Sequence, residues 1–266
     1  MIRPTKHESG FTLIELLVAM VIGLILLLGV SQVFLSSRQT FATNDSMTKL
    51  QENGRFALDF IASTARQAGY LSPGSPADRP FPIEPINCSR GSACSSNGAT
   101  PLGDRVSFSA EPALMIDGNL RDCAGQSVPA DKIITNSYFI IPATMGNPQP
   151  SLGCSSYSGN NGQPVTVNQR LIDGIESLQV LYGIASNESP LSVGSFISAD
   201  SVELQNRWAD VVAVRIAVLA NSIDPVTPTP PQRGYYLLDA APIIPAADDR
   251  RAKQIFTTTI QLKNVY

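Results

Sequence analysis

The chain has 266 residues and a formal net charge of −3 at pH 7. A slightly acidic balance does not favour nucleic-acid binding, which needs a basic surface. The single histidine, His7, lies in an N-terminal leader that we expect to be removed, which disfavours Ser-His-Asp catalysis and histidine-ligated zinc. We therefore expect neither an enzyme nor a cofactor.

The N-terminus combines a basic leader, residues 1–10, with an apolar run. Residues 11–30 contain only two polar side chains, Thr12 and Glu15, and are long enough to cross a hydrocarbon core. In a secretory signal the cut follows the apolar run. Here the small, flexible Gly10 precedes it. A cut at Gly10 would keep the apolar helix on the mature protein and make Phe11 its N-terminus.

Glu15 places a carboxylate in this apolar run, where charge is costly. One interpretation is a charged flank of a signal anchor. We favour another, because Glu15 lies four residues, or one helical turn, after Phe11. A staggered neighbouring helix brings its own N-terminal amine to this carboxylate, so the buried charge has a partner only in an assembly.

The hexapeptide GFTLIE at residues 10–15, followed by an apolar helix, resembles the class III signal of type IV pilins and type II secretion pseudopilins. The resemblance implies that prepilin peptidase cuts between Gly10 and Phe11 and methylates the Phe11 amine. It also implies that Glu15 aids methylation and subunit docking.

Proline is absent from residue 11 to about residue 69, which permits one helix. We expect residues 11–35 to lie in the membrane or the filament core. Residues 36–69 are amphipathic, and we expect them to pack on a globular domain; a membrane anchor followed by a separate stalk is the alternative. The apolar stripe comprises Met47, Leu50, Gly54, Leu58, Ile61, Ala65 and Ala68.

Four cysteines follow the helix in Ser/Gly/Pro-rich surroundings: Cys88, Cys94, Cys123 and Cys154. Their spacing does not suggest a zinc ribbon, and an oxidising periplasm favours two disulfides. Of the three possible pairings, Cys88–Cys94 with Cys123–Cys154 closes the shortest loops.

Residues 70–266 are expected to form one β-rich domain. The fold class is α+β and pilin-like, a long N-terminal helix on a mainly antiparallel sheet with one wet face. We expect a loop over residues 142–164 held by Cys154, a solvated charge run at residues 248–251, and Trp208 in the core. The predicted strands are residues 106–109, 114–116, 132–141, 165–168, 171–184, 211–219 and 255–263.

Residues 173–183, with the sequence DGIESLQVLYG, resemble a strand of PilW-type minor pilins, and residues 208–219 and 256–264 are similar to the strands that follow it. The chain is identified on this resemblance as a minor pilin of type IV pilus assembly. The implied role is in the priming or tip complex, and so in pilus-dependent motility and adhesion. A J-type minor pseudopilin of type II secretion is the alternative, and a DNA-uptake or adhesive pilin is less favoured.

The resemblance also implies partners and location. The partners are prepilin peptidase, other minor pilins, the major pilin and a pilus-tip adhesin, with no nucleic acid. Before assembly the protein spans the inner membrane once, with its domain in the periplasm; afterwards it lies in the pilus at the cell surface.

Overall fold

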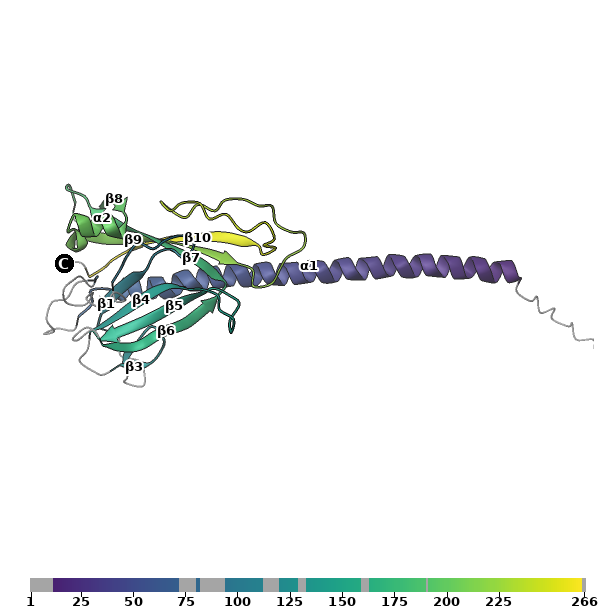
Figure 1. The fold of residues 1–266 in the computed structure, drawn as a ribbon, viewed down its shortest axis with the longest axis horizontal. Helices are drawn as coiled ribbons and strands as arrows, with labels where there is room; N and C mark the ends of the chain where they lie inside the picture. The colour runs from purple at the N-terminus through teal and green to yellow at the C-terminus, as the bar shows by residue number, and fades with distance from the viewer. Residues whose placement is uncertain are drawn as a thin grey trace, which may run out of the picture. The chain divides into compact units, whose positions relative to one another are not determined.

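The computed structural model describes residues 12–71, 80–81, 94–111, 120–128, 133–158, 163–189 and 191–264. The chain divides into two compact units, Met1–Asp45 and Ser46–Tyr266. Helix α1, Leu13–Gln67, contributes to both units (Figure 1). The predicted continuous helix is therefore confirmed.

Two four-stranded antiparallel sheets form the body of the second unit (Figure 1). Their strand orders are β1-β4-β5-β6 and β10-β9-β7-β8, and β2 pairs separately with β3. This arrangement confirms the α+β fold class. The strands are β1 Val106–Ala110, β2 Leu120–Arg121, β3 Ser127–Val128, β4 Ile134–Ile141, β5 Ser151–Ser158, β6 Pro164–Asp173, β7 Ile175–Ala185, β8 Val193–Ile197, β9 Val211–Asn221 and β10 Lys253–Gln261. A short helix α2, Ala199–Leu204, and a 3-10 turn, Trp208–Asp210, lie between β8 and β9.

The predicted strand over residues 171–184 is two strands in different sheets. β6 ends at Asp173, Gly174 has a φ of 81°, and β7 begins at Ile175. Glycine adopts this positive φ without steric cost. The Gly174 N–H donates to the carbonyl of Pro150 at 2.8 Å, and its carbonyl accepts from the N–H of Asn221 at 2.7 Å. The apolar pattern runs through the bend, so it conceals the change of sheet.

The predicted loop over residues 142–164 contains an inner strand, β5, so that prediction is wrong. The sequence SLGCSSYS is rich in small polar residues and gives a weak strand signal. All of β5 except Ser158 is buried, because β4 and β6 pair with it on both sides. Its hydroxyls have partners in the fold: Ser156 Oγ donates to Asp122 at 2.5 Å, and Ser151 Oγ donates to Asp173 at 2.5 Å.

The second sheet lacks the uniformly wet outer face that we predicted. β9 is buried at every residue except the half-buried Arg215. Ala217 and Leu219 pack under side chains of the proline-rich connection between β9 and β10, namely Tyr235, Leu237 and Ile243. This connection is therefore a covering layer as well as a link between strands.

The amphipathic part of α1 packs against both sheets, and the predicted apolar stripe is confirmed. Every member of the stripe is buried except Met47, which is half-buried against the core. The Thr64 and Tyr138 hydroxyl oxygens lie 2.6 Å apart, joining α1 to β4. The ring of Phe256, on β10, occupies the space beside Gly54. Burial along α1 begins at Ser46, whereas the composition changes near Ser36.

Trp208 lies in the core, as predicted. Its ring centroid is 5.0 Å from that of Tyr182 and 5.4 Å from that of Phe81. Tyr182 is fully buried on β7, so this cluster connects the second sheet to the segment before β9.

Candidate functional site: the N-terminal helix

The candidate residues of the N-terminal signal lie on either side of the first described position. Gly10 and Phe11 lie outside the described residues, so cleavage and methylation there stay predictions. Glu15 is the third residue of α1.

Thr12 and Glu15 form hydrogen bonds with each other across the first turn of α1. The Thr12 N–H and the Thr12 hydroxyl both donate to Oε2 of Glu15 at 2.9 Å. In return, the Glu15 N–H donates to Oγ1 of Thr12 at 3.4 Å. This two-way arrangement is a capping box, with Thr12 at the N-cap and Glu15 at the third helical position. It gives the helix start polar partners within its own chain.

The sequence-based predictions for Glu15 concern methylation and docking to a neighbouring subunit, and the structure adds a role in capping the helix. The signal for it is present in the sequence, because Thr-x-x-Glu directly before an apolar run is the signature of a capping box. A carboxylate is also favoured by the partial positive charge at a helix N-terminus. A single subunit can therefore carry Glu15 at this position before any neighbour arrives.

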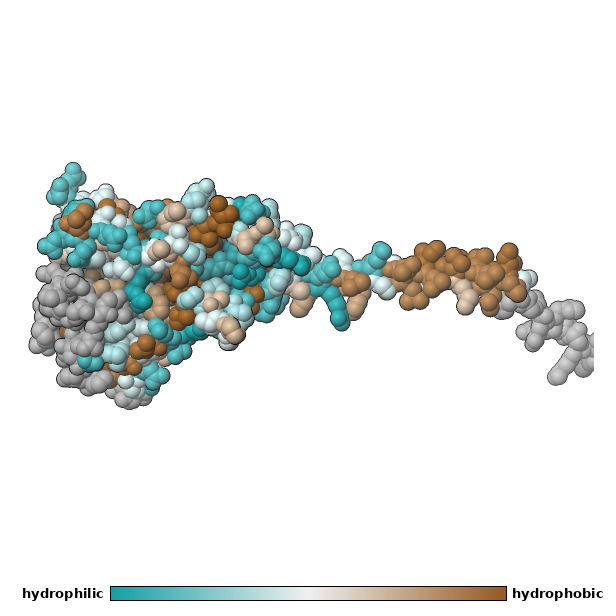
Figure 2. All heavy atoms as spheres, viewed as in Figure 1, coloured by the Kyte–Doolittle hydropathy of each residue, from teal (hydrophilic) through white to brown (hydrophobic). Residues whose placement is uncertain are grey.

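The first part of α1 has an exposed, apolar surface. Every residue from Thr12 to Ala42 is exposed. The large apolar side chains between Leu13 and Leu35 are 51% to 77% exposed, and Figure 2 shows them as an almost unbroken brown surface. Helix α1 contains an 18-residue stretch with a mean hydropathy of 2.9 and is long and apolar enough to cross a membrane. Such a surface requires lipid or other protein around it.

Two of the four candidate cysteines form a disulfide. Cys123, in the turn between β2 and β3, is joined to Cys154 on β5, with the Cα atoms 6.5 Å apart. Asp122 adds to this attachment, because its carboxylate accepts from the hydroxyls of Ser156 and Thr166 at 2.5 Å each. The β2–β3 hairpin is thus fastened to the first sheet.

The second favoured pair, Cys88 with Cys94, stays a prediction because Cys88 lies outside the described residues. None of the cysteines that the structure describes is free. Over the same described ranges, no group of three or more His, Cys, Asp and Glu side chains could hold a metal ion.

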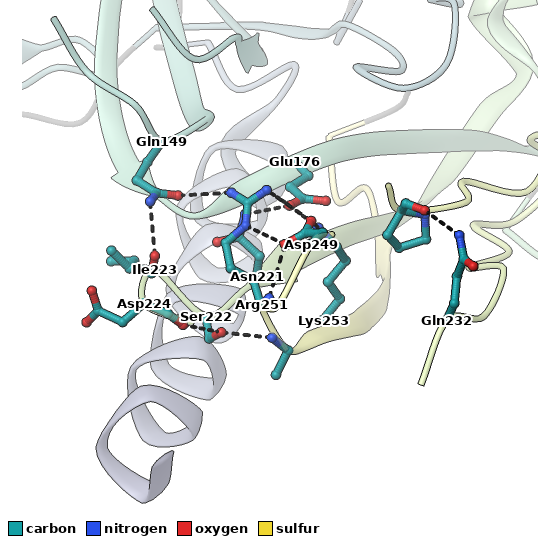
Figure 3. Close-up of polar contacts among 12 residues, drawn as sticks. Gln149, Glu176, Asn221, Ser222, Ile223, Asp224, Gln232, Asp249, Arg251 and Lys253 are labelled. Carbon is teal, nitrogen blue, oxygen red and sulfur yellow. Dashed lines mark hydrogen bonds and ion pairs between the residues drawn. The ribbon is translucent and has the colours of Figure 1, made fainter. Parts of the chain in front are cut away.

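The charge run at residues 248–251 is only half solvated, and the prediction is wrong for Asp249 and Arg251. Asp248 and Arg250 are exposed, but the side chains of Asp249 and Arg251 are only 11% and 28% exposed. Both point toward Glu176 on β7 (Figure 3). Alternate residues face outward and inward, as they do along a strand.

Four charged side chains make up the resulting network (Figure 3). Asp249 accepts from Nε of Arg251 at 2.9 Å and pairs with Nζ of Lys253 at 2.9 Å. Lys253 also pairs with Glu176, which accepts from Nδ2 of Asn221 at 2.6 Å. Burial alone would raise the pKa of Asp249, but the hydrogen bonds from Arg251 and Lys253 outweigh it and lower that pKa. The network is balanced in charge and ties the proline-rich connection to β7 and β10.

Two protein-family models match parts of this chain. Residues 137–264 match the family described as type IV pilus-assembly protein W, PilW, and residues 5–31 match the prokaryotic N-terminal methylation motif. A solved type IV-like pilin from Thermus thermophilus has 14% sequence identity and a TM-score of 0.46, over 82% of this chain and 98% of that chain. No curated protein matches the chain.

The two family matches coincide with the features described above. The PilW match runs from β4 to the end of β10, and the methylation-motif match contains the capping box and the apolar start of α1. Proteins of this family are typically structural, not enzymatic. The chain belongs to the PilW family of type IV pilus assembly proteins and is a minor pilin in pilus assembly.

Proposed function

We propose that this minor pilin works in the complex that primes the pilus and then lies at its tip, and so supports pilus-dependent motility and adhesion. The observation that carries the proposal is the exposed apolar surface of α1 from Thr12 onward. A large apolar side chain gains about 1.5–3 kcal/mol when it is fully removed from water. A helix of this kind leaves the bilayer only if other helices cover it.

Prepilin peptidase acts first in this proposal. It removes residues 1–10 and methylates the Phe11 amine, while the protein spans the inner membrane once with its domain in the periplasm. After assembly the protein lies in the pilus at the cell surface. Intact-mass measurement of the mature protein tests this step: it should begin at methylated Phe11, and Gly10→Val should leave the precursor uncut. A mature N-terminus beyond residue 30 would show that the segment is an ordinary secretory signal.

Glu15 has room for both of its roles. The two hydrogen bonds that the Glu15 carboxylate accepts from Thr12 both use Oε2, and the third contact uses the Glu15 N–H. Oε1 makes no hydrogen bond within the described part of the chain, and it is the atom that we assign to the N-terminal amine of a neighbouring subunit. The capping box then holds the carboxylate in place before and after docking.

The proposed partners are other minor pilins, the major pilin and a tip adhesin. Deletion of the gene, with wild-type complementation, tests the proposal through counts of surface pili and twitching. Secretion by any type II system is measured in the same strains. Loss of pili with unchanged secretion is the expected result. Unchanged pili would refute the proposal. Loss of secretion with pili intact would also favour the pseudopilin alternative.

A further inference from the structure

Three side chains of complementary chemistry meet at the end of β9, within the second unit: Lys253, Asn221 and Glu176 (Figure 3). Nζ of Lys253 and Nδ2 of Asn221 both contact the same atom, Oε1 of Glu176. The contact from Asn221 is 2.6 Å long. One carboxylate therefore holds an amine and a carboxamide side by side.

The strand register explains why these three side chains meet. Lys253 lies directly opposite Asn221 in the antiparallel pair of β10 and β9, so both side chains project from the same face of the sheet. Alternation along β7 from the core residue Leu178 would aim residue 176 into the core. The pairing of β7 with β9 has a register shift at Glu176, and a bulge of this kind re-aims a side chain. Three strands thus contribute one group each.

The site is almost closed to water. Asn221 is fully buried, and the side chains of Lys253 and Glu176 are 3% and 15% exposed. Oδ1 of Asn221 is buried and makes no hydrogen bond with any residue that the structure describes. A buried polar atom without a partner is rare in native proteins and costs free energy, so its presence calls for an explanation such as a reactive role.

We propose that Lys253 and Asn221 join in an intramolecular isopeptide bond, with Glu176 as the general base. Glu176 takes a proton from the Lys253 ammonium, and the neutral Nζ attacks Cγ of Asn221. The Nζ–Cγ bond forms and the Cγ–Nδ2 bond breaks. Nζ gives up two protons in all, and both leave on the displaced nitrogen as ammonium, so Glu176 ends ionised. The reaction needs no oxidant, reductant or further reactant.

The charges around the site remain paired after the ammonium has left. Lys253 also pairs with Asp249 at 2.9 Å, and this positive charge is lost in the reaction. Arg251 stays beside both carboxylates, because its Nε lies 2.9 Å from Asp249 and its Nη2 lies 3.7 Å from Oε1 of Glu176. A buried carboxylate without a counter-charge would be costly. The product fastens β10 to β9 and closes the proline-rich connection into a covalent ring.

Peptide mapping of the full chain in detergent, after reduction and digestion, tests the bond by mass spectrometry. The expected product is a branched peptide that joins the segments of Lys253 and Asn221 and is lighter than their sum by one ammonia molecule. Lys253→Arg keeps the positive charge but removes the amine, and it should give no branched peptide. Lys263→Arg changes an exposed lysine on the same side of the chain's last strand and should leave the yield unchanged.

Glu176→Gln keeps both reacting groups and removes only the base. A general base typically contributes about 100-fold or more to a rate, so this variant should give far less branched peptide than wild type. An intact Cys123–Cys154 bond verifies folding in each variant. The wild-type protein alone decides whether the bond exists: unlinked Lys253 and Asn221, or loss of ammonia without a branched peptide, would overturn the inference. An equal yield from Glu176→Gln would overturn the role of Glu176. The inference does not depend on the proposed function, since deletion phenotypes leave the peptide map unchanged.

Discussion

The ring of Phe256 fills the space that a side chain at Gly54 would need. A Cβ placed on Gly54 would overlap the ring atoms of Phe256, so β10 and α1 approach each other at a position without a side chain. Glycine within a helix usually costs about 1 kcal/mol relative to alanine. At this position the close approach explains why a poor helix former is present.

Gly54→Ala should therefore destabilise the chain despite its better helix propensity. Overpacking of this kind typically costs about 1–3 kcal/mol. Chemical denaturation of the protein in detergent measures the loss, with the exposed helical substitution Gln51→Ala as the control. Adding Phe256→Leu should recover part of the stability. A stabilised Gly54→Ala variant would mean that the two elements do not pack this closely.

Glu15→Ala should still insert into the membrane but enter pili poorly. Removal of the carboxylate makes the helix more apolar, so insertion should not suffer. Both the cap and the charge for a neighbour's amine are lost. Fractionated membranes and sheared pili give the share of the variant in each, and methylation of Phe11 is measured in the same samples.

Glu15→Gln separates the two roles of this residue, because a glutamine at this position can keep the capping box without the charge. It should enter pili as poorly as Glu15→Ala if the amine pairing is needed. Wild-type entry of the glutamine variant would show that capping alone is enough.

The pH dependence of stability should reflect Asp249. Its folded pKa is lowered by Arg251 and Lys253, whereas the unfolded value is about 3.9. The stabilisation is therefore present above about pH 4 and is lost as the pH falls through the lower folded value. Asp249→Asn should be less stable than wild type at pH 7, by about 3 kcal/mol for a buried pair that loses one partner. This difference should shrink below pH 4, as measured by denaturation at each pH.

Asp104 provides an internal comparison of opposite sign. Its burial raises the pKa to about 6, although the N–H groups of Gly98 and Val180 donate to it at 3.0 and 2.8 Å. The stability that it contributes is therefore full below about pH 4 and is lost as the pH rises through about 6.

A difference between Asp249→Asn and wild type that stays constant from pH 7 to pH 2 would contradict the assignment to Asp249.

The Cys123–Cys154 bond should account for a measurable part of the stability of the domain. A disulfide that closes a loop of this length, with a sequence separation of 31, typically contributes about 2–4 kcal/mol. Cys123→Ser with Cys154→Ser should lower the denaturation midpoint. Mass spectrometry of the non-reduced, digested wild-type protein should show this pair and no alkylatable thiol. Four alkylatable cysteines would refute the disulfides.

Regular patterns in the sequence were enough to predict the helix and most of the strands. The stripe through Leu50 and Ile61 repeats at helical spacing, and the alternation on β9 and β10 repeats at strand spacing, so each pattern predicts its element. β5 is rich in Ser and Gly and lacks such a pattern. It forms a strand only because β4 and β6 pair with it on both sides. The bend at Gly174 is hidden by the apolar residues on both sides of it.

Local charge was harder to interpret than local hydrophobicity. Residues 248–251 resemble a solvated loop because Glu176, which pairs with Arg251, lies far away in the sequence, and Lys253, which pairs with Asp249, lies just beyond the run. The role of Thr12 is different: its capping signal is local and complete in the sequence. Local sequence patterns can predict a helix cap, but they cannot predict an ion pair whose partner is distant in sequence.

The last strand has a consequence for biogenesis. The apolar stripe of α1 is synthesised early, yet the residues that cover it include β10, near the C-terminus, and the Asn264 side chain donates to the carbonyl of Ala68 across 196 residues at 3.2 Å. Contacts between residues so distant in sequence form late, and they reduce the folding rate. During synthesis this stripe stays uncovered until β10 has been made. A chain truncated before β10 should therefore be bound by chaperones or degraded, even though its apolar N-terminal segment and its methylation motif are intact.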